Sequence, residues 1–233
     1  MKRKISIVLL LCVMFMSACA EKPHPPEEMP PVITVDAEVI QEEELVYVYE
    51  QAVEDYLFPV EDFSWERNYA PEYVMLHFCS AVVEHRNDPY NMTYVRDTFV
   101  YYDVSVHYIV ERDGTVRCYI PEDRVAWHAG AGMWNDDETY TNTMNQYAIG
   151  IEVLAIGSQA DMALYLTPEE YAALNESDIG YTEEQYEALK LLIADICQRN
   201  NIPMDKEHVI GHDAYSPGKT DPGELFDWNR IFS

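Results

Sequence analysis

Two polar side chains that could do chemistry lie inside apolar stretches of the sequence. His77 lies within residues 73–79, and an imidazole in a buried strand must satisfy two ring nitrogens, by hydrogen bonds or by binding a metal. Glu152 lies within residues 147–153, and a buried carboxylate is costly unless it is paired, hydrogen-bonded or near a metal. The residues alone leave two other interpretations open, a hydrogen-bonded core histidine and a glutamate with a cationic partner.

A glycine- and proline-rich stretch near the C-terminus, residues 211–223, carries three more functional groups, His212, Lys219 and Asp221. Proline and glycine stiffen such a loop, and loops fixed by a rigid scaffold commonly present catalytic groups. A polar surface loop without a catalytic role would have a similar composition. A further short motif, AWHAG at 126–130, adds a tryptophan next to a histidine.

These groups are far apart in the chain, so a scaffold must bring them together. The strands, hairpin and helices are predicted from hydrophobic pattern and turn residues. Buried strands are predicted at 73–79, 148–154 and 209–210, and a hairpin with an Asp-Gly turn is predicted at 104–110 and 115–120. A helix is predicted at 182–199, where Thr182 and Gln185 form a capping box at its start, and a less regular helix at 43–57. This order predicts an α/β fold, a single domain with a mixed central β-sheet flanked by helices.

Five motifs together resemble the amidase-2 family of N-acetylmuramoyl-L-alanine amidases, which is related to peptidoglycan recognition proteins and phage amidase lysozymes. They are VMLHF around His77, SVHYIVERDGTV at 105–116, AWHAG at 126–130, AIGIE at 148–152 and GHDAYSPGKTDPG at 211–223. The motifs occur in the family's order and cover about residues 70–230. The resemblance implies a zinc site at one edge of a surface cleft and an enzyme that acts on peptidoglycan or muropeptides.

The resemblance also assigns roles to individual positions. It implies that His77, His212 and Asp221 bind Zn²⁺, that Glu152 handles protons and that Lys219 faces the reacting carbonyl. Two imidazoles and one carboxylate leave the fourth tetrahedral position for water, as in catalytic zinc sites. The implied reaction is zinc-dependent hydrolysis of the amide bond between N-acetylmuramic acid and L-alanine.

Three residues near these positions are open to more than one interpretation. His128 and Trp127 are expected to contact substrate at the cleft, although they could equally serve packing. Many family members carry a threonine close after the first zinc-binding histidine, whereas this chain has Cys79 there. Residues two apart in a strand share a face, so the Cys79 thiolate could become a fourth ligand and block the water position. A plain buried thiol is the interpretation we favour.

The N-terminus has the composition of an exported lipoprotein. Lys2 to Lys4 precede an apolar run that is too short to span a bilayer and suits a secretory signal. The run ends in a sequence that resembles a lipobox and that makes Cys19 the lipidated first residue of the mature chain. We therefore expect a signal peptide at 1–18, an acidic, proline-rich tether and extension at 19–62 and the catalytic domain at 63–233. This places the protein in the cell envelope, anchored to the outer face of the cytoplasmic membrane or to an outer membrane.

Composition and motifs argue against several other classes of function. The chain has 42 acidic and 15 basic residues, and such a surface repels nucleic acid. The sequence contains no HExxH motif of a zinc peptidase. The main alternative to an enzyme is a non-catalytic peptidoglycan-binding module of the same fold. Such proteins usually lack a zinc ligand, whereas every ligand position is filled here, so we expect an enzyme, acting as a monomer.

Replacement of the lipobox cysteine tests the predicted anchor. Cys19→Ser removes the thiol that would carry the acyl chains, so the protein should move from the membrane fraction to the soluble fraction. Fractionation of cells that express either form measures the change. Continued membrane association of the variant would contradict lipidation at Cys19.

Overall fold

The computed structural model describes residues 59–232. The expected signal peptide, Cys19 and the predicted helix at 43–57 lie outside these residues, so they stay predictions. Among residues 59–232, none of the helices has the length and apolar character needed to cross a membrane.

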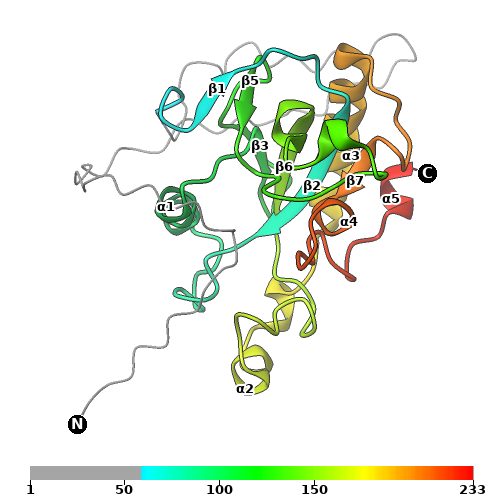
Figure 1. The fold of residues 1–233 in the computed structure, drawn as a ribbon. Helices are drawn as coiled ribbons and strands as arrows, with labels where there is room; N and C mark the ends of the chain where they lie inside the picture. Colours follow the sequence, from blue (N-terminus) through cyan, green and yellow to red (C-terminus); the bar gives the residue numbers. More distant parts are fainter. Residues whose placement is uncertain (1–58, 233) are drawn as a thin grey trace.

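A five-stranded mixed sheet forms the centre of the domain, as predicted (Figure 1). Its neighbouring strands are parallel except for the antiparallel edge pair of β3 and β4. The strands in spatial order are β4 (Val116–Cys118), β3 (Tyr108–Val110), β6 (Ala148–Leu154), β2 (Tyr73–Cys79) and β7 (Val209–Gly211). The two predicted strands at 73–79 and 148–154 match β2 and β6 residue for residue.

The hairpin strands are shorter than the predicted ranges 104–110 and 115–120. Residues 104–106 do not pair with β4, because their backbone bonds elsewhere: the N–H of Val104 donates to Phe99 O and that of Ser105 to Trp127 O, both at 3.1 Å. His107 bonds on both sides, since its N–H donates to Gly150 O at 3.2 Å and its carbonyl oxygen accepts the Tyr119 N–H at 2.8 Å. The Asp113-Gly114 turn is where the sequence placed it.

Strand alternation gives the sheet two different faces. Val74 and Leu76 of β2, with Ile149 and Ile151 of β6, pack into one hydrophobic cluster on the face covered by α3 (Glu183–Asn200). The intervening residues point to the other face. There β2 and β6 pair in a register that puts His77 directly beside Glu152. The functional residues of these strands therefore share the face that α3 leaves uncovered.

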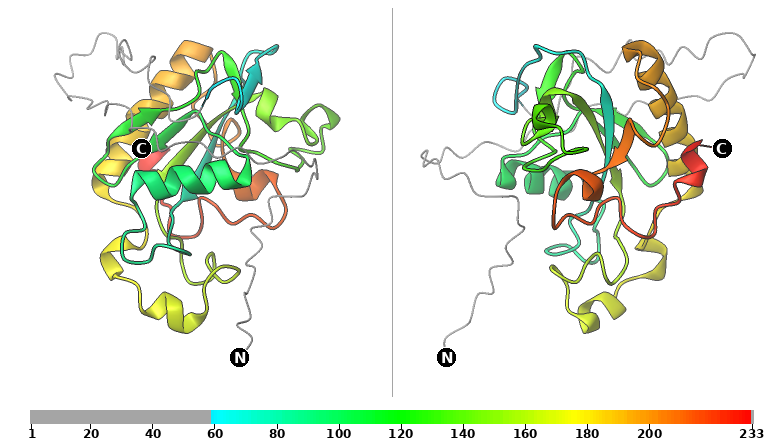
Figure 2. Two further views of the ribbon diagram at one scale, coloured as in Figure 1. Left: turned by 90° about the vertical axis from the view of Figure 1, so that its left-hand side faces the viewer. Right: turned by 45° about the vertical axis from the view of Figure 1, so that its right-hand side comes forward.

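Helix α1 (Met92–Tyr102) lies on the opposite side of the sheet from α3 (Figure 2). Its buried residues Met92, Val95 and Phe99 pack with Ile109 and other side chains in a second cluster. The sequence analysis did not predict this helix. The predicted helix at 182–199 is α3, and its expected capping box of Thr182 and Gln185 is present.

The remaining elements surround this core. Two short strands form a separate antiparallel pair, and a long connection between β6 and α3 projects from one end of the sheet (Figures 1 and 2). These elements are β1 (Ser64–Glu66), β5 (Arg124–Ala126), α2 (Pro168–Ala172), α4 (His212–Tyr215), α5 (Asn229–Phe232) and three short 3₁₀ helices at Glu138–Tyr140, Met144–Gln146 and Glu176–Asp178.

Candidate active site

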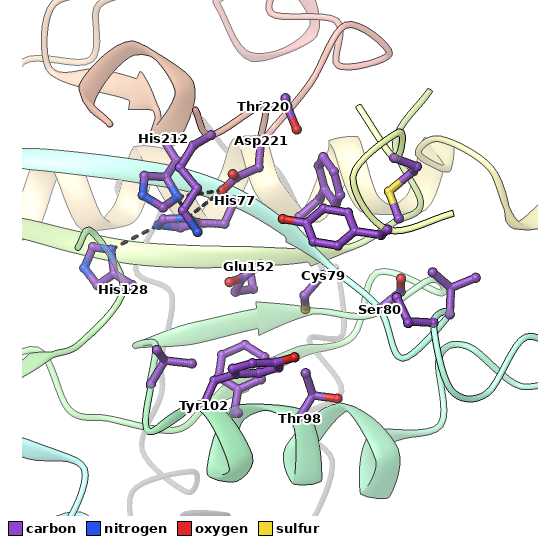
Figure 3. Close-up of a pocket in the computed structure, with 18 of the residues that line it drawn as sticks. His77, Cys79, Ser80, Thr98, Tyr102, His128, Glu152, His212, Thr220 and Asp221 are labelled. Atoms are coloured by element: carbon purple, nitrogen blue, oxygen red, sulfur yellow. Dashed lines mark hydrogen bonds and ion pairs between the residues drawn. The ribbon is translucent and has the colours of Figure 1, made fainter. Parts of the chain in front are cut away.

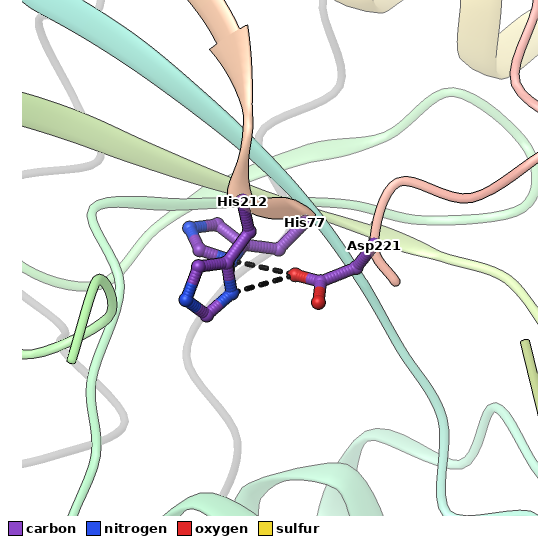
Figure 4. Close-up of side chains that lie close together, drawn as sticks. All are labelled: His77, His212 and Asp221. Carbon is purple, nitrogen blue, oxygen red and sulfur yellow. Dashed lines mark hydrogen bonds and ion pairs between the residues drawn. The ribbon is translucent and has the colours of Figure 1, made fainter. Parts of the chain in front are cut away.

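Two histidines and one aspartate meet at the carboxyl ends of the central strands (Figure 4). The Nδ1 atoms of His77 and His212 are 3.0 Å apart, and each lies 2.9 Å from Oδ2 of Asp221. Both histidines are buried. Among the described residues these three form a group able to hold a metal ion. The structure thus brings together the three ligands that the sequence analysis proposed.

Each of the three side chains comes from a different element. His77 projects from β2, and His212 begins α4 immediately after β7, the strand that pairs with β2. Asp221 lies on the glycine- and proline-rich loop that follows α4. This loop is held in place because the backbone carbonyls of Asp221 and of the next residue are both bonded: Asp213 N–H donates to Asp221 O at 2.9 Å, and the Tyr181 hydroxyl donates to Pro222 O at 2.6 Å.

The hydrogen-bond partners of the rings suit a metal site. Nε2 of His212 lies 2.9 Å from the carbonyl oxygen of Ala129, which can only accept, so this nitrogen carries the hydrogen. In the neutral ring Nδ1 then offers its lone pair toward Asp221 and His77. A lone pair that faces a carboxylate is unfavourable without a cation between them. The donor set of two imidazoles and one carboxylate therefore fits a divalent ion such as zinc.

The pKa values of these groups agree with this interpretation. Burial, and next the charge of His212, lower the pKa of His77 to about 4, although Asp221 opposes the shift. Burial alone would raise the pKa of Asp221, but the charges and hydrogen bonds of His212 and His77 outweigh it and bring the pKa below its usual range. At neutral pH His77 is therefore an uncharged ligand and Asp221 a carboxylate, the forms that bind metals.

Glu152 lies beside this group in the same pocket (Figure 3). Burial, and next the negative charge of Asp221, raise the pKa of the Glu152 carboxyl to about 8. A hydrogen bond with the Cys79 thiol and the charge of Lys219 oppose this shift. Its Oε2 atom is buried and has no hydrogen-bond partner within the described residues. A carboxylate that has one oxygen hydrogen-bonded and the other without a partner is suited to accept a proton.

The pocket extends from the metal ligands to α1. Figure 3 shows Glu152 and Cys79 between the ligands on one side and Tyr102 and Thr98 of α1 on the other. Lys219 lines this pocket as well. The sequence analysis placed Glu152 and Lys219 near the reacting group, and the structure puts both in one pocket with the three metal-ligand candidates.

The alternative that Cys79 is a fourth metal ligand receives no support from the geometry. Cys79 lines the pocket together with His77, as the two-residue spacing predicted. The metal-ligand group contains no sulfur, however, among the described residues. Burial, and next the charge of Glu152, raise the pKa of the Cys79 thiol well above its usual value. The thiol therefore remains protonated and contacts Glu152 instead.

His128 lies directly behind His77, one of the three metal-ligand candidates. Its Nδ1 is 3.0 Å from Nε2 of His77, and burial with the charges of His77 and His107 lowers its pKa well below the usual range. Two further residues hold it there. The Asn145 side chain accepts the backbone N–H of His128 at 3.0 Å, and a Cβ on Gly150 would lie 2.6 Å from the His128 ring. The ring thus fixes the orientation of His77, and such outer partners tune metal binding.

His128 lines the pocket, and its Nε2 atom is buried without a hydrogen-bond partner within residues 59–232. Its contact with substrate stays a prediction. Trp127 is placed differently. Its ring packs against Phe63 and Trp65, with centroids 6.2 and 5.4 Å away, and it is absent from the lining of the pocket. Trp127 therefore does not lie beside the three metal-ligand candidates, and this position gives no support to its predicted contact with substrate.

Asp161 is a site residue that the sequence analysis missed. Its Oδ2 accepts the Ser158 hydroxyl at 2.9 Å and the Glu224 N–H at 3.3 Å, so it connects a pocket wall to the loop of Asp221. The neighbouring Met162 lines the pocket. A Cβ on Gly223 would lie 2.6 Å from this oxygen, so the glycine makes room for the contact. An isolated aspartate in a polar loop has no distinguishing pattern in the sequence.

Gly150→Ala tests the support of His77. The added Cβ would displace the His128 ring, so zinc affinity should fall by about 10–100-fold, and overpacking should lower the free energy of unfolding by about 1–3 kcal/mol. Metal titration and denaturant unfolding measure both effects. The same substitution in a His128→Ala background should cost less, since no ring is left to displace. Strictly additive costs would show that the ring is not involved.

A model of the Amidase_2 family, described as N-acetylmuramoyl-L-alanine amidase, matches residues 67–224. The chain is 33% identical over 129 residues to the 1,6-anhydro-N-acetylmuramyl-L-alanine amidase AmpD of Enterobacter cloacae, 55% of each chain. It is also 33% identical over 137 residues to the N-acetylmuramoyl-L-alanine amidase AmiD of Escherichia coli, 55% of this chain and 43% of that protein. The chain therefore spans about half the length of these curated relatives.

Solved structures show the same fold. An AmpD crystal structure superposes with a TM-score of 0.52 and 23% identity, over 73% of this chain and 88% of that chain. The E. coli amidase AmiD, solved with anhydro-N-acetylmuramic acid-L-Ala-D-γ-Glu-L-Lys, has the same TM-score and identity, over 83% and 64% of the two chains. Since the family model covers more than half of the sequence, this chain belongs to the Amidase_2 family of N-acetylmuramoyl-L-alanine amidases.

Proposed function

We propose that this protein is a zinc-dependent amidase that hydrolyses the amide bond between N-acetylmuramic acid and L-alanine in peptidoglycan or its fragments. The observation that carries the proposal is the convergence of His77, His212 and Asp221, with the open Oε2 atom of Glu152 in the same pocket. Membership in a family of amidases and the names of the relatives support the same reaction.

Zinc, held by His77, His212 and Asp221, would supply Lewis acidity and make water a better nucleophile near neutral pH. The protein side chains provide the rest. Glu152 accepts a proton at its open oxygen and returns it to the leaving nitrogen of L-alanine, while the Cys79 thiol holds the carboxyl group. The leaving amine needs this proton, because an amide anion is a very poor leaving group.

The cationic side chain of Lys219 lines the pocket together with the carboxylates of Glu152 and Asp221. We assign it to the oxygen of the scissile carbonyl, where its ammonium group offsets the negative charge that develops during attack. Loss of one such donor typically costs about 3 kcal/mol in activation free energy. The buried side chains that line the pocket, such as His77 and His212, strengthen this effect, because charges interact more strongly away from bulk water.

The N-terminal sequence supports a location for this activity. A lipid on Cys19 would hold the catalytic domain at the outside of a membrane, where the acidic, proline-rich residues after it serve as a spacer toward the wall. The protein acts there as a monomer on peptidoglycan or muropeptides. This location rests on the N-terminal sequence.

Asp221→Asn tests the metal site with little change of shape. Loss of the charge should reduce zinc affinity by roughly 100-fold or more, since even outer partners are worth 10–100-fold, and amidase activity should fall with it. His77→Ala and His212→Ala should do the same. His208→Ala is the matched control, because His208 pairs with Asp205 outside the pocket. Metal analysis of the purified proteins gives the result. A ligand variant with full zinc content and full activity would refute the assignment.

Glu152→Gln separates proton transfer from metal binding. The variant should keep its zinc and lose about 10²–10⁴-fold in turnover on a defined muropeptide, since the amide cannot accept a proton. Glu138→Gln, an exposed residue, serves as the control. Turnover of the unmodified protein should fall as the pH drops through the pKa of Glu152, because protonation disables a base. That pKa is about 8 without metal, and a bound cation lowers it.

Two other outcomes have a definite meaning. Unchanged turnover of Glu152→Gln removes this residue from the mechanism. Zinc binding by the native protein without release of stem peptide from either purified wall or a soluble muropeptide would favour a non-catalytic peptidoglycan-binding module.

A further inference from the structure

A second, open groove continues from the catalytic pocket. The two share the side chains of Val83, Thr98, Tyr102 and Tyr165, so a chain-like ligand can pass from one to the other without leaving the surface. One wall of the groove is α1, and the other is the segment around residues 163–170 that precedes and includes the start of α2. None of the three metal-ligand candidates lines the groove, so it lies beyond the catalytic pocket.

Tyrosine rings dominate the walls of this groove. Tyr94, Tyr101 and Tyr102 come from α1, and Tyr165 faces them from the other wall. Tyr94 is stacked on His85 at 3.6 Å between ring centroids, and the rings of Tyr101 and Tyr102 meet edge to face at 4.9 Å. These contacts fix the rings before a ligand arrives, which reduces the entropy lost on binding.

The outer end of the groove exposes apolar surface. Tyr101 is 80% exposed and Leu164 is 65% exposed, and they lie on opposite walls. Tyrosine at such a site offers an apolar ring face and a hydroxyl group, which suits a ligand that is apolar on one face and rich in hydroxyls at its edge. Pyranose rings have this character, since their axial C–H groups form an apolar face.

The charge of the groove distinguishes between the two halves of the substrate. Its lining contains Glu84, Asp97 and Glu170 but a single arginine, Arg86, and no lysine. Arg86 is already paired with Glu170 at 2.6 Å and Asp97 with Arg96 at 3.0 Å, so the lining offers neither a lysine nor an unpaired arginine to a carboxylate ligand. A stem peptide carries free carboxylates, for example on a γ-linked glutamate, and these would be repelled. N-acetylated sugars are neutral, and the muramoyl carboxyl group is consumed in the scissile amide. The groove therefore favours the glycan.

We propose that this groove, from Tyr102 and Tyr165 out to Tyr101 and Leu164, is a glycan subsite that binds the sugars attached to the reacting muramoyl unit. The inference rests on the proposed amidase function and adds which part of the substrate lies where. Because the groove is open at its outer end, it accepts a continuing glycan chain. The enzyme accordingly favours substrates with several sugars over a single muramoyl peptide.

The test compares two substrates that carry the same stem peptide. One is N-acetylmuramoyl-peptide and the other is a short N-acetylglucosamine–N-acetylmuramic acid oligomer. The native zinc-loaded protein should have the higher kcat/KM on the oligomer. Tyr101→Ala should reduce the ratio of the two kcat/KM values by about threefold to tenfold, mainly through KM of the oligomer, since one aromatic packing contact is lost. Tyr101→Phe should retain the ratio, because it keeps the ring.

Tyr69→Ala is the matched control, since Tyr69 is also an exposed tyrosine, 55% accessible, but packs on Tyr147 outside both cavities. It should leave the ratio as it is. Equal kcat/KM on both substrates would overturn the glycan subsite and leave the amidase function standing. A Tyr101→Ala effect that grows with stem-peptide length would assign the groove to the peptide and also overturn it. Cleavage of neither substrate would remove both proposals.

Discussion

The site depends on the parallel pairing of β2 with β6 on one side and β7 on the other. This register puts His77 beside Glu152 and ends β7 at the residue before His212, so residues up to 144 positions apart meet within hydrogen-bond distance. A shift of one residue would turn the functional side chains of a strand toward α3 and its hydrophobic cluster. The apolar residues on the α3 face therefore also determine the geometry of the candidate metal site, since they fix the register.

Burial gives these residues their chemical character. It removes water from the rings of His77 and His128, whose pKa values fall, and from Glu152, whose pKa rises. An uncharged His77 imidazole and an ionised Asp221 suit a cation, and a carboxyl group with a raised pKa suits a proton acceptor. The excess of acidic residues elsewhere has little part in this, because charges exposed to solvent are screened.

Much of this arrangement could be predicted from the sequence, because strong local patterns marked it. Apolar runs gave β2 and β6, a capping box gave the start of α3, and the motif order indicated the ligands. Helix α1 was missed, because its sequence is rich in aromatic and β-branched residues, which favour strands, and its caps Asn91 and Asp103 are common in turns. The support of the site was also missed. Gly150 and Asp161 matter through close approach to distant residues, and spacing along the chain does not reveal that.

The position of Asp161 has a consequence for how such an enzyme can diversify. Its single carboxylate joins the wall that carries Met162 to the loop that carries Asp221. Mutations that reshape this wall to admit a different muropeptide would pull on the ligand loop as well. Substrate recognition and metal binding are therefore expected to change together when this wall is mutated. Changes of specificity that leave the ligand loop undisturbed should arise on the α1 side, where no such hydrogen bond to the ligand loop is seen within residues 59–232.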